Sequence, residues 1–211
     1  MKNINNNQIE NFYREQYVLL HEKDFHYFAG YQTVFLNKYF SKLMPYFNIK
    51  TILDYGCGKG YQYISENSHK LWRCEKIYLY DIGVYEFSVK PDKSKTFDCV
   101  LCLDVMEHLR EEDIEYYLQD IIFYAEKLAV FSISTRPAGK TLPNGMNAHL
   151  TVKPIDWWNN KFIEFCSTYK VKSKIIIMYE LESDKEKKKV QLFYINFDNK
   201  EIEEVKKFEK I

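Results

Sequence analysis

Hydrophobic residues recur at two different intervals along this chain, and the intervals predict which segments are helices and which are strands. Aromatic and aliphatic residues return at helical spacing over 9–20 and 25–47, and Pro45 is placed to end the second helix. Further helices are expected over 61–70, 111–127 and 154–166. Short apolar runs predict strands over 51–55, 76–80, 97–103, 128–134, 172–181 and 190–197, with a weak strand over 86–89.

Strands that alternate with helices predict an α/β fold, a doubly wound and mostly parallel sheet in a three-layer sandwich. The sheet has seven strands, or six if the weak strand does not form, and a charged turn before the last strand predicts an antiparallel hairpin there. We expect one domain of 211 residues. It consists of an N-terminal helical lid over 1–48, a core over 49–197, and a C-terminal tail over 198–211 that forms a short surface helix or an irregular segment.

Composition supports a packed interior, because 46% of the residues are hydrophobic and 17% are aromatic. Thirty basic residues balance thirty acidic ones, so the chain has no overall charge with which to bind nucleic acid, and no nucleic-acid partner is expected. The polar N-terminus and the lack of a long apolar stretch predict a cytoplasmic protein without a membrane partner. Cys99 and Cys102 lie in an apolar run, which favours buried side chains over a metal site, and no metal is expected.

The most informative segment is the turn after the first strand, Asp54-Tyr55-Gly56-Cys57-Gly58-Lys59-Gly60. Glycines at this position permit positive φ and let a ligand approach the backbone closely. The dinucleotide pattern G-x-G-x-x-G fails here, since its third glycine falls on Tyr61 in one frame and on Tyr63 in the other. The turn therefore argues against a nicotinamide cofactor.

This turn resembles motif I of the class I S-adenosylmethionine-dependent methyltransferases. The resemblance continues with Asp81 at the end of the second strand, with Ile82 beside it, and with the stretch from Thr96 to Leu109 that matches the fourth-strand pattern of the family. It covers about residues 49–197 and implies a Rossmann-like core that binds S-adenosylmethionine and releases S-adenosylhomocysteine. The implied cofactor-binding residues are Asp54, Gly56, Gly58, Gly60, Asp81, Ile82 and Leu103. The segment between the second and fourth family strands, residues 82–96, is short, and its Asp92 lies in a turn-like, lysine-rich stretch that makes it a poor candidate to read the adenine amine.

Candidate acceptor-binding groups gather after the later strands. Asp104 and His108 follow the strand over 97–103, and a long polar loop over 135–150 ends near His149. We expect His149 to be the general base, against the alternative that it only holds its loop, and Asp104 and His108 to assist catalysis. Residues expected to bind the substrate are Arg136, Lys140, Asn144, Asn147 and, from the lid, Tyr31.

These features favour methyl transfer to a small polar or anionic acceptor, with O-methylation favoured over N-methylation. The run over 135–158 also resembles a segment of small bacterial methyltransferases of unassigned or surface-glycan-related role, which implies a place in polysaccharide biosynthesis. A nucleic-acid or protein methyltransferase and a non-catalytic module that binds S-adenosylmethionine stay open as alternatives. Against base methylation, residues 103–106 lack the N/D-P-P-Y motif. The acceptor's identity and the oligomeric state do not follow from the sequence.

Overall fold

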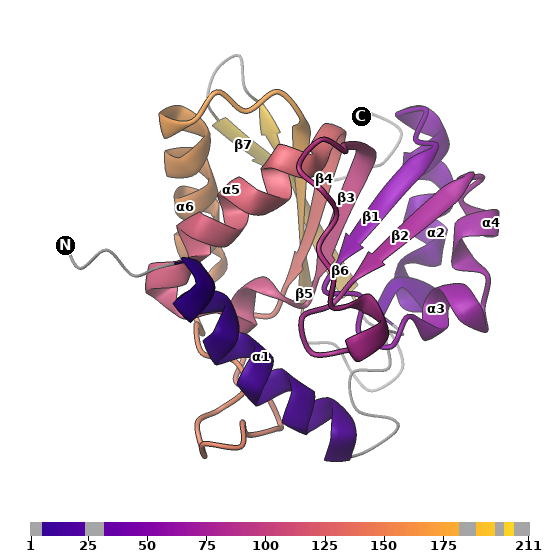
Figure 1. Cartoon of the computed structure of the whole chain (residues 1–211). Helices are drawn as coiled ribbons and strands as arrows, with labels where there is room; N and C mark the ends of the chain where they lie inside the picture. The colour runs from indigo at the N-terminus through magenta and orange to yellow at the C-terminus, as the bar shows by residue number, and fades with distance from the viewer. Residues whose placement is uncertain (1–5, 24–31, 182–188, 197–200, 205–211) are drawn as a thin grey trace.

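A computed structural model describes residues 6–23, 32–181, 189–196 and 201–204 (Figure 1). The helices are α1 (Asn6–Lys23), α2 (Gln32–Tyr46), α3 (Tyr61–Ile64), α4 (Ser68–Leu71), α5 (Ile114–Tyr124) and α6 (Ile155–Thr168). The strands are β1 (Thr51–Tyr55), β2 (Lys76–Tyr80), β3 (Phe97–Leu103), β4 (Ala125–Ile133), β5 (Lys174–Leu181), β6 (Lys189–Asn196) and β7 (Glu201–Glu204).

The sheet runs in the order β2-β1-β3-β4-β5-β6-β7. The first five of these strands, β2 to β5, are all parallel to their neighbours, while β6 pairs antiparallel with β5 and β7 antiparallel with β6. The predicted α/β class with a parallel sheet is therefore confirmed. Because parallel strands point the same way, β1 to β4 all end at the edge of the sheet where the predicted site residues follow.

Three local expectations are wrong. A 3-10 helix over Tyr85–Phe87 stands where the weak strand was expected, and the expected helix over 61–70 is split into α3 and α4. The tail expected to be a helix or irregular contains β7 instead, because its residues pair with β6. Each error concerns a short segment whose structure depends on its neighbours in space more than on its own periodicity.

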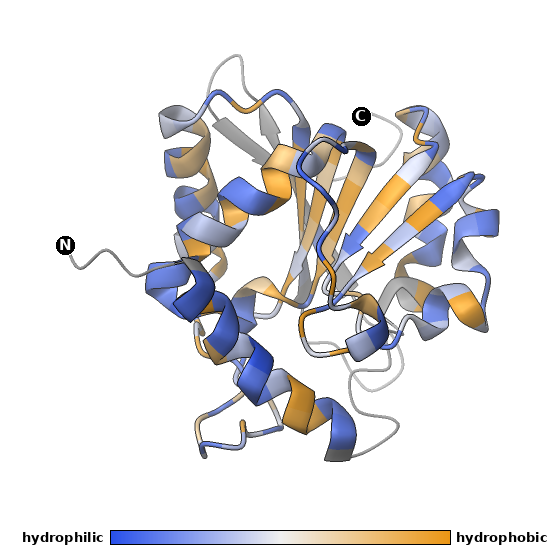
Figure 2. Cartoon of the chain, in the orientation of Figure 1, coloured by the Kyte–Doolittle hydropathy of each residue, from blue (hydrophilic) through white to orange (hydrophobic). Residues whose placement is uncertain are grey.

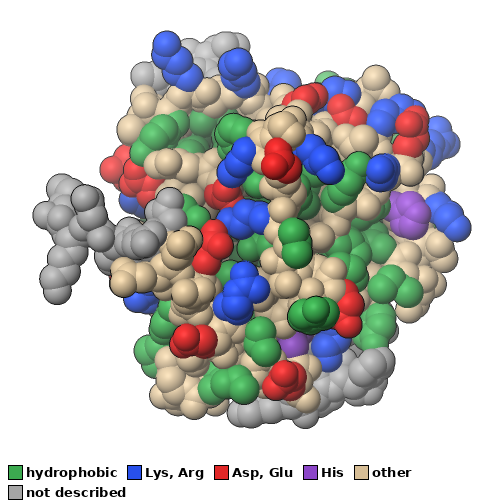
Figure 3. Space-filling model, viewed as in Figure 1, with side chains coloured by type: hydrophobic (Ala, Val, Ile, Leu, Met, Phe, Trp, Pro, Cys, Tyr) green, Lys and Arg blue, Asp and Glu red, His purple; other side chains and the backbone are tan. Residues whose placement is uncertain are grey.

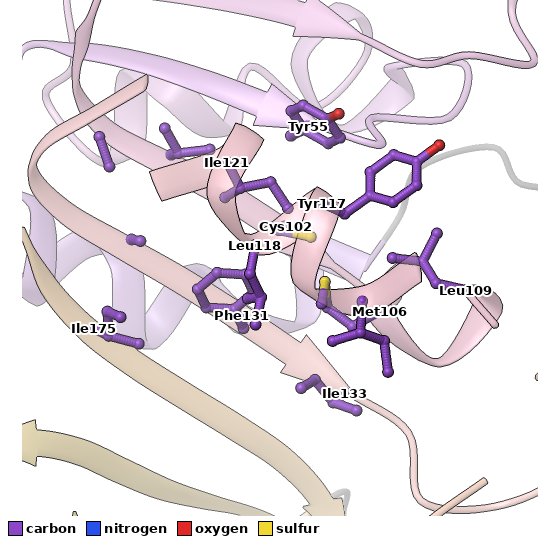
Figure 4. Packing of buried hydrophobic residues seen from close by; sticks show 14 of the residues in the cluster. Tyr55, Cys102, Met106, Leu109, Tyr117, Leu118, Ile121, Phe131, Ile133 and Ile175 are labelled. Atoms are coloured by element: carbon purple, nitrogen blue, oxygen red, sulfur yellow. The ribbon is translucent and has the colours of Figure 1, made fainter. Parts of the chain in front are cut away.

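Successive side chains of a strand point to opposite faces of the sheet, so the hydrophobic interior has two layers. In β3, Val100 and Cys102 face a cluster that includes α5 and α6, whereas Cys99 and Leu101 face a second cluster that includes α2. Figure 2 shows this as apolar strands flanked by helices whose outer faces are polar. Figure 4 shows the first layer, where Tyr117, Leu118 and Ile121 of α5 point toward the sheet. The central strands of the parallel sheet are thus covered on both faces, while the edge strand β2 is only partly buried.

Helix α1 lies beside the carboxyl ends of the strands, on the side of α5 (Figure 1). Its inward stripe advances by four residues, from Ile9 to Tyr13 to Tyr17. Ile9 and Tyr13 join the α5 cluster, and the Tyr13 hydroxyl donates to Asp113 Oδ2 at 2.5 Å. Nearer its end, Leu20 packs with residues of the long loop after β4. Tertiary contacts therefore fix α1 at both ends.

On the face seen in Figure 3, basic and acidic side chains are interspersed. Within the described part of the chain, no helix is long and apolar enough to cross a membrane. The same residues include no group of three histidine, cysteine or acidic side chains placed to hold a metal ion.

Truncation of a side chain in the α5–α6 layer tests the packing. Phe131 of β4 is fully buried, and its ring lies 4.8 Å from that of Phe162. We expect Phe131→Ala to lower the free energy of unfolding by about 3–5 kcal/mol, measured by urea denaturation, because a cavity replaces the ring. Phe123→Ala is the matched control, since that ring is 48% exposed, and should cost less than about 1 kcal/mol. Equal losses would contradict the assigned layers.

Candidate active site

The turn between β1 and α3 has a backbone that requires its glycines. Gly56, Gly58 and Gly60 have φ values of 90°, 57° and 68°, a region that residues with a Cβ rarely adopt. A Cβ at Gly56 would also lie 2.3 Å from Cγ2 of Val105. The turn therefore has a backbone that glycine adopts without strain, and Val105 packs closely against it at Gly56.

Asp81 joins this turn to the end of β2. Its Oδ2 accepts the Gly58 N–H at 2.8 Å, and its Oδ1 accepts the Gly83 N–H at 2.9 Å. An ionised carboxylate has about four lone-pair sites, so each oxygen retains capacity for one more donor. A carboxylate with remaining acceptor capacity beside a glycine turn fits the ribose hydroxyls of S-adenosylmethionine. Ile82 is partly buried against the α5 cluster, and Leu103 is buried in the α2 cluster.

Asp54 lies behind the turn. The side chain is enclosed, and its Oδ2 accepts hydrogen bonds from Gln62 Nε2 at 3.0 Å and from the Tyr63 hydroxyl at 2.8 Å. Burial raises the pKa of Asp54 to about 7, although both hydrogen bonds act in the opposite direction. Asp54 therefore braces the turn against α3, and its predicted contact with the cofactor stays a prediction.

Two carboxyl groups follow β3. Asp104 has a φ of 54°, and its Oδ1 accepts the Ser132 hydroxyl at 2.9 Å. Glu107 is fully buried; its Oε1 accepts the Ser134 N–H at 2.8 Å, and its Oε2 has no hydrogen-bond partner among the described residues. Burial, and then the charge of Asp104, raise the pKa of Glu107 well above its ordinary value. The enclosed site thus favours the neutral form of the Glu107 carboxyl group.

Two histidines meet beside this pair, with ring centroids 4.7 Å apart. His108 Nδ1 lies 2.8 Å from the Ala148 carbonyl oxygen and 2.9 Å from the Tyr17 hydroxyl. Burial lowers the pKa of His108 to about 3, so it is neutral across the physiological range. These contacts connect the strand end, the long loop and α1. They describe a residue that holds the site together, and a catalytic role for His108 stays a prediction.

His149 Nδ1 lies 2.5 Å from the Arg136 carbonyl oxygen. A carbonyl only accepts, so Nδ1 carries the proton of the neutral ring and Nε2 carries the lone pair. Burial lowers the pKa of His149 from 6.5, and the Arg136 charge lowers it further. The ring is therefore a neutral base at pH 7, with its Nδ1 oriented by the loop.

The other predicted loop residues divide into two groups. Asn147 shapes the loop, since its Oδ1 accepts the Ala138 and His149 N–H groups and its Nδ2 donates to the Ala138 carbonyl. Asn144 is exposed, and its Oδ1 accepts the Met146 N–H at 3.1 Å. Arg136 and Lys140 carry positive charges that act on the histidines of this region. Tyr31 lies outside the described residues.

His21 of α1 also lies at this site, although its sequence context gives no sign of it. Its side chain is 7% exposed, and its Nε2 lies 3.6 Å from Asp81 Oδ1. Burial lowers the pKa of His21, as do the charges of Lys59 and Lys140, while Asp81 raises it. The spacing of Tyr13, Tyr17 and His21 by four residues places them on one face of α1, but nothing in the sequence says that this face meets Asp81.

A parallel α/β sheet, a glycine turn of positive φ after its first strand and a carboxylate after the second are the features of a class I S-adenosylmethionine-dependent methyltransferase. The family model described as "Methyltransferase domain" matches residues 28–173, more than half of the chain. The chain belongs to this family, and is therefore an enzyme with S-adenosylmethionine as methyl donor and S-adenosylhomocysteine as product. No curated protein and no solved structure matches the chain.

The buried carboxyl behind the turn gives a pH-dependent stability. The pKa of Asp54 is raised from 3.8 to about 7, so its contribution to folding is fully present below about pH 4 and is lost as the pH rises toward 7. Asn has no proton to bind. We therefore expect the free energy of unfolding of Asp54→Asn, measured by urea denaturation, to rise relative to that of the wild type by a few kcal/mol between about pH 4.5 and pH 7.5. For the exposed control Asp92→Asn, the free energy of unfolding should change with pH as that of the wild type does above about pH 5. A constant difference between Asp54→Asn and the wild type would contradict the buried protonated acid.

Proposed function

We propose that this enzyme methylates a hydroxyl group of a small polar or anionic molecule, with His149 as the general base. The single observation that carries the proposal is the neutral imidazole of His149, whose proton is held on Nδ1 by the Arg136 carbonyl at 2.5 Å. A hydroxyl must lose its proton as the methyl group is transferred, and a positioned neutral imidazole accepts that proton well.

The cofactor-binding side of the proposal consists of the glycine turn and Asp81. The bare backbone of Gly56, Gly58 and Gly60 would lie against the cofactor, and the Asp81 carboxylate would accept its ribose hydroxyls. S-adenosylmethionine, when bound, supplies a methyl group that its positively charged sulfonium already makes electrophilic. The protein then has only to orient the acceptor and remove its proton, and orientation is worth up to ~7–11 kcal/mol of the barrier.

The charges around the histidines support a polar or anionic acceptor. Lys140 lowers the pKa of both His21 and His108, Lys59 lowers that of His21, and Arg136 lowers that of His149. These three cations therefore lie close enough to affect groups at the strand ends. Burial raises the pKa of Glu107, which favours the neutral form of that carboxyl group. Sugars and sugar phosphates of the kind used to build surface glycans are the first acceptors to screen, by release of S-adenosylhomocysteine.

Removal of the Asp81 carboxylate tests the cofactor-binding side. We expect Asp81→Ala to weaken S-adenosylhomocysteine binding by ~2–4 kcal/mol in isothermal titration, because hydrogen bonds to a charged group are lost. Asp92→Ala is the control, because Asp92 lies in an exposed turn between β2 and β3, and this variant should bind S-adenosylhomocysteine as the wild type does. Unchanged affinity in Asp81→Ala would refute the ribose-binding role.

Removal of the His149 imidazole tests the base. For any acceptor that the wild type methylates, His149→Ala should lower kcat by ~10²-fold or more and leave S-adenosylhomocysteine affinity unchanged. Since the pKa of His149 lies below 6.5, the wild-type rate should be constant above about pH 7 and fall as the ring is protonated in acid. His69→Ala serves as the control. Wild-type turnover in His149→Ala would assign the ring to loop structure.

A further inference from the structure

Helix α1 is held firmly against the core by charged and hydroxyl groups. Lys90 Nζ donates to Glu10 Oε1 of α1 at 2.6 Å and to Asp120 Oδ2 of α5 at 2.8 Å. The Tyr116 hydroxyl also donates to Glu10, at 2.7 Å. Together with the bond from Tyr13 to Asp113, these contacts set where the second half of α1 lies.

That second half lies directly on the segment that follows β2. A Cβ placed on Gly83 would be 2.7 Å from Cδ2 of His21 and 2.8 Å from Cβ of Tyr17. Gly83 thus allows an approach that any other residue would block. As a result the His21 ring is brought to Asp81, with Nε2 3.6 Å from Oδ1, and both side chains are nearly enclosed, at 7% and 12% exposure.

The chain that follows Asp81 contacts this acid through the Gly83 N–H. It forms a short 3-10 helix and turns, in which Tyr85 and Val89 are 88% and 83% exposed. The groups that face His21 from the elements around it are Asp81, Lys59 and Lys140. A separation of 3.6 Å between Nε2 and Oδ1 is too long for a strong hydrogen bond, but it lets both atoms reach one hydroxyl group.

We propose that His21 is a cofactor-binding residue, and that its Nε2–H donates to a ribose hydroxyl of S-adenosylmethionine while that hydroxyl donates to Asp81. The roles are complementary, because a hydroxyl is both donor and acceptor, a carboxylate only accepts, and a neutral imidazole has one N–H to give. Helix α1 thereby completes the nucleoside side of the site in place of the short segment after Asp81. The inference rests on the ribose-binding role proposed for Asp81.

The test is isothermal titration of the full chain with S-adenosylhomocysteine and with its 2′-deoxy and 3′-deoxy analogues. We expect His21→Ala to weaken S-adenosylhomocysteine binding about tenfold, the size of one hydrogen bond, and His21→Gln, which keeps an N–H donor, to recover part of it. The loss should shrink to less than about threefold for the one analogue that lacks the shared hydroxyl. Glu22→Ala, an exposed neighbour on α1, should bind as the wild type does.

A second pair of variants tests the approach of the helix. Gly83→Ala should lower the affinity for S-adenosylhomocysteine about as much as His21→Ala, and the double variant should lose little more than either single one. Gly139→Ala is the control, since a Cβ there meets nothing within 4 Å. Thermal unfolding checks that each variant is folded.

The outcomes separate this inference from the proposed function. Unchanged affinity in His21→Ala, tighter binding, or an equal loss for S-adenosylhomocysteine and both deoxy analogues would overturn the inference while a loss in Asp81→Ala still supports the site. Unchanged affinity in both His21→Ala and Asp81→Ala would overturn the proposed ribose site as well.

Discussion

The hydrogen bond from the Gly58 N–H to the Asp81 carboxylate is the contact on which the rest of the site depends. Strands β1 and β2 are paired in parallel and in a register that sets Tyr55 beside Tyr80, so both chains leave the sheet at the same level. The glycine turn and the acid therefore meet, and the carboxylate fixes a backbone donor that would be costly to bury alone. The ends of α1 and of the long loop are arranged around this junction.

Burial decides which groups at the strand ends carry charge. It raises the pKa of Asp54 to about 7 and that of Glu107 well above its ordinary value, and it lowers the pKa values of His108 and His149. Burial acts in this direction because it costs free energy to ionise a group in a low dielectric. Charge is left on residues nearer to solvent, including Arg136. The result is a region whose inner groups accept and donate hydrogen bonds while its rim provides the electrostatic field.

Much of the fold, and the positions of the main site residues, could be predicted from the sequence. Apolar runs marked the five parallel strands because the side chains of the central strands are buried on both faces of the sheet. The positive φ values of Gly56, Gly58 and Gly60 agree with the expected backbone. The 3-10 helix at Tyr85–Phe87 and strand β7 were missed, because the structure of a short segment depends on the elements that it packs against. His21 was missed for a different reason: its role is visible only when α1 has been placed against Asp81, 60 residues further along the chain.

The sequence by itself determined the class of fold, the family, and the positions of the glycine turn and of Asp81. Periodicity, glycine spacing and an acid at a strand end are local signals. Only the tertiary structure decided that Asp54 faces α3, that Glu107 is enclosed, and that the Tyr17 and His21 face of α1 covers the strand ends. The physical reason is that burial and the approach of distant segments set protonation and hydrogen-bond partners. Neither quantity exists until the chain has packed.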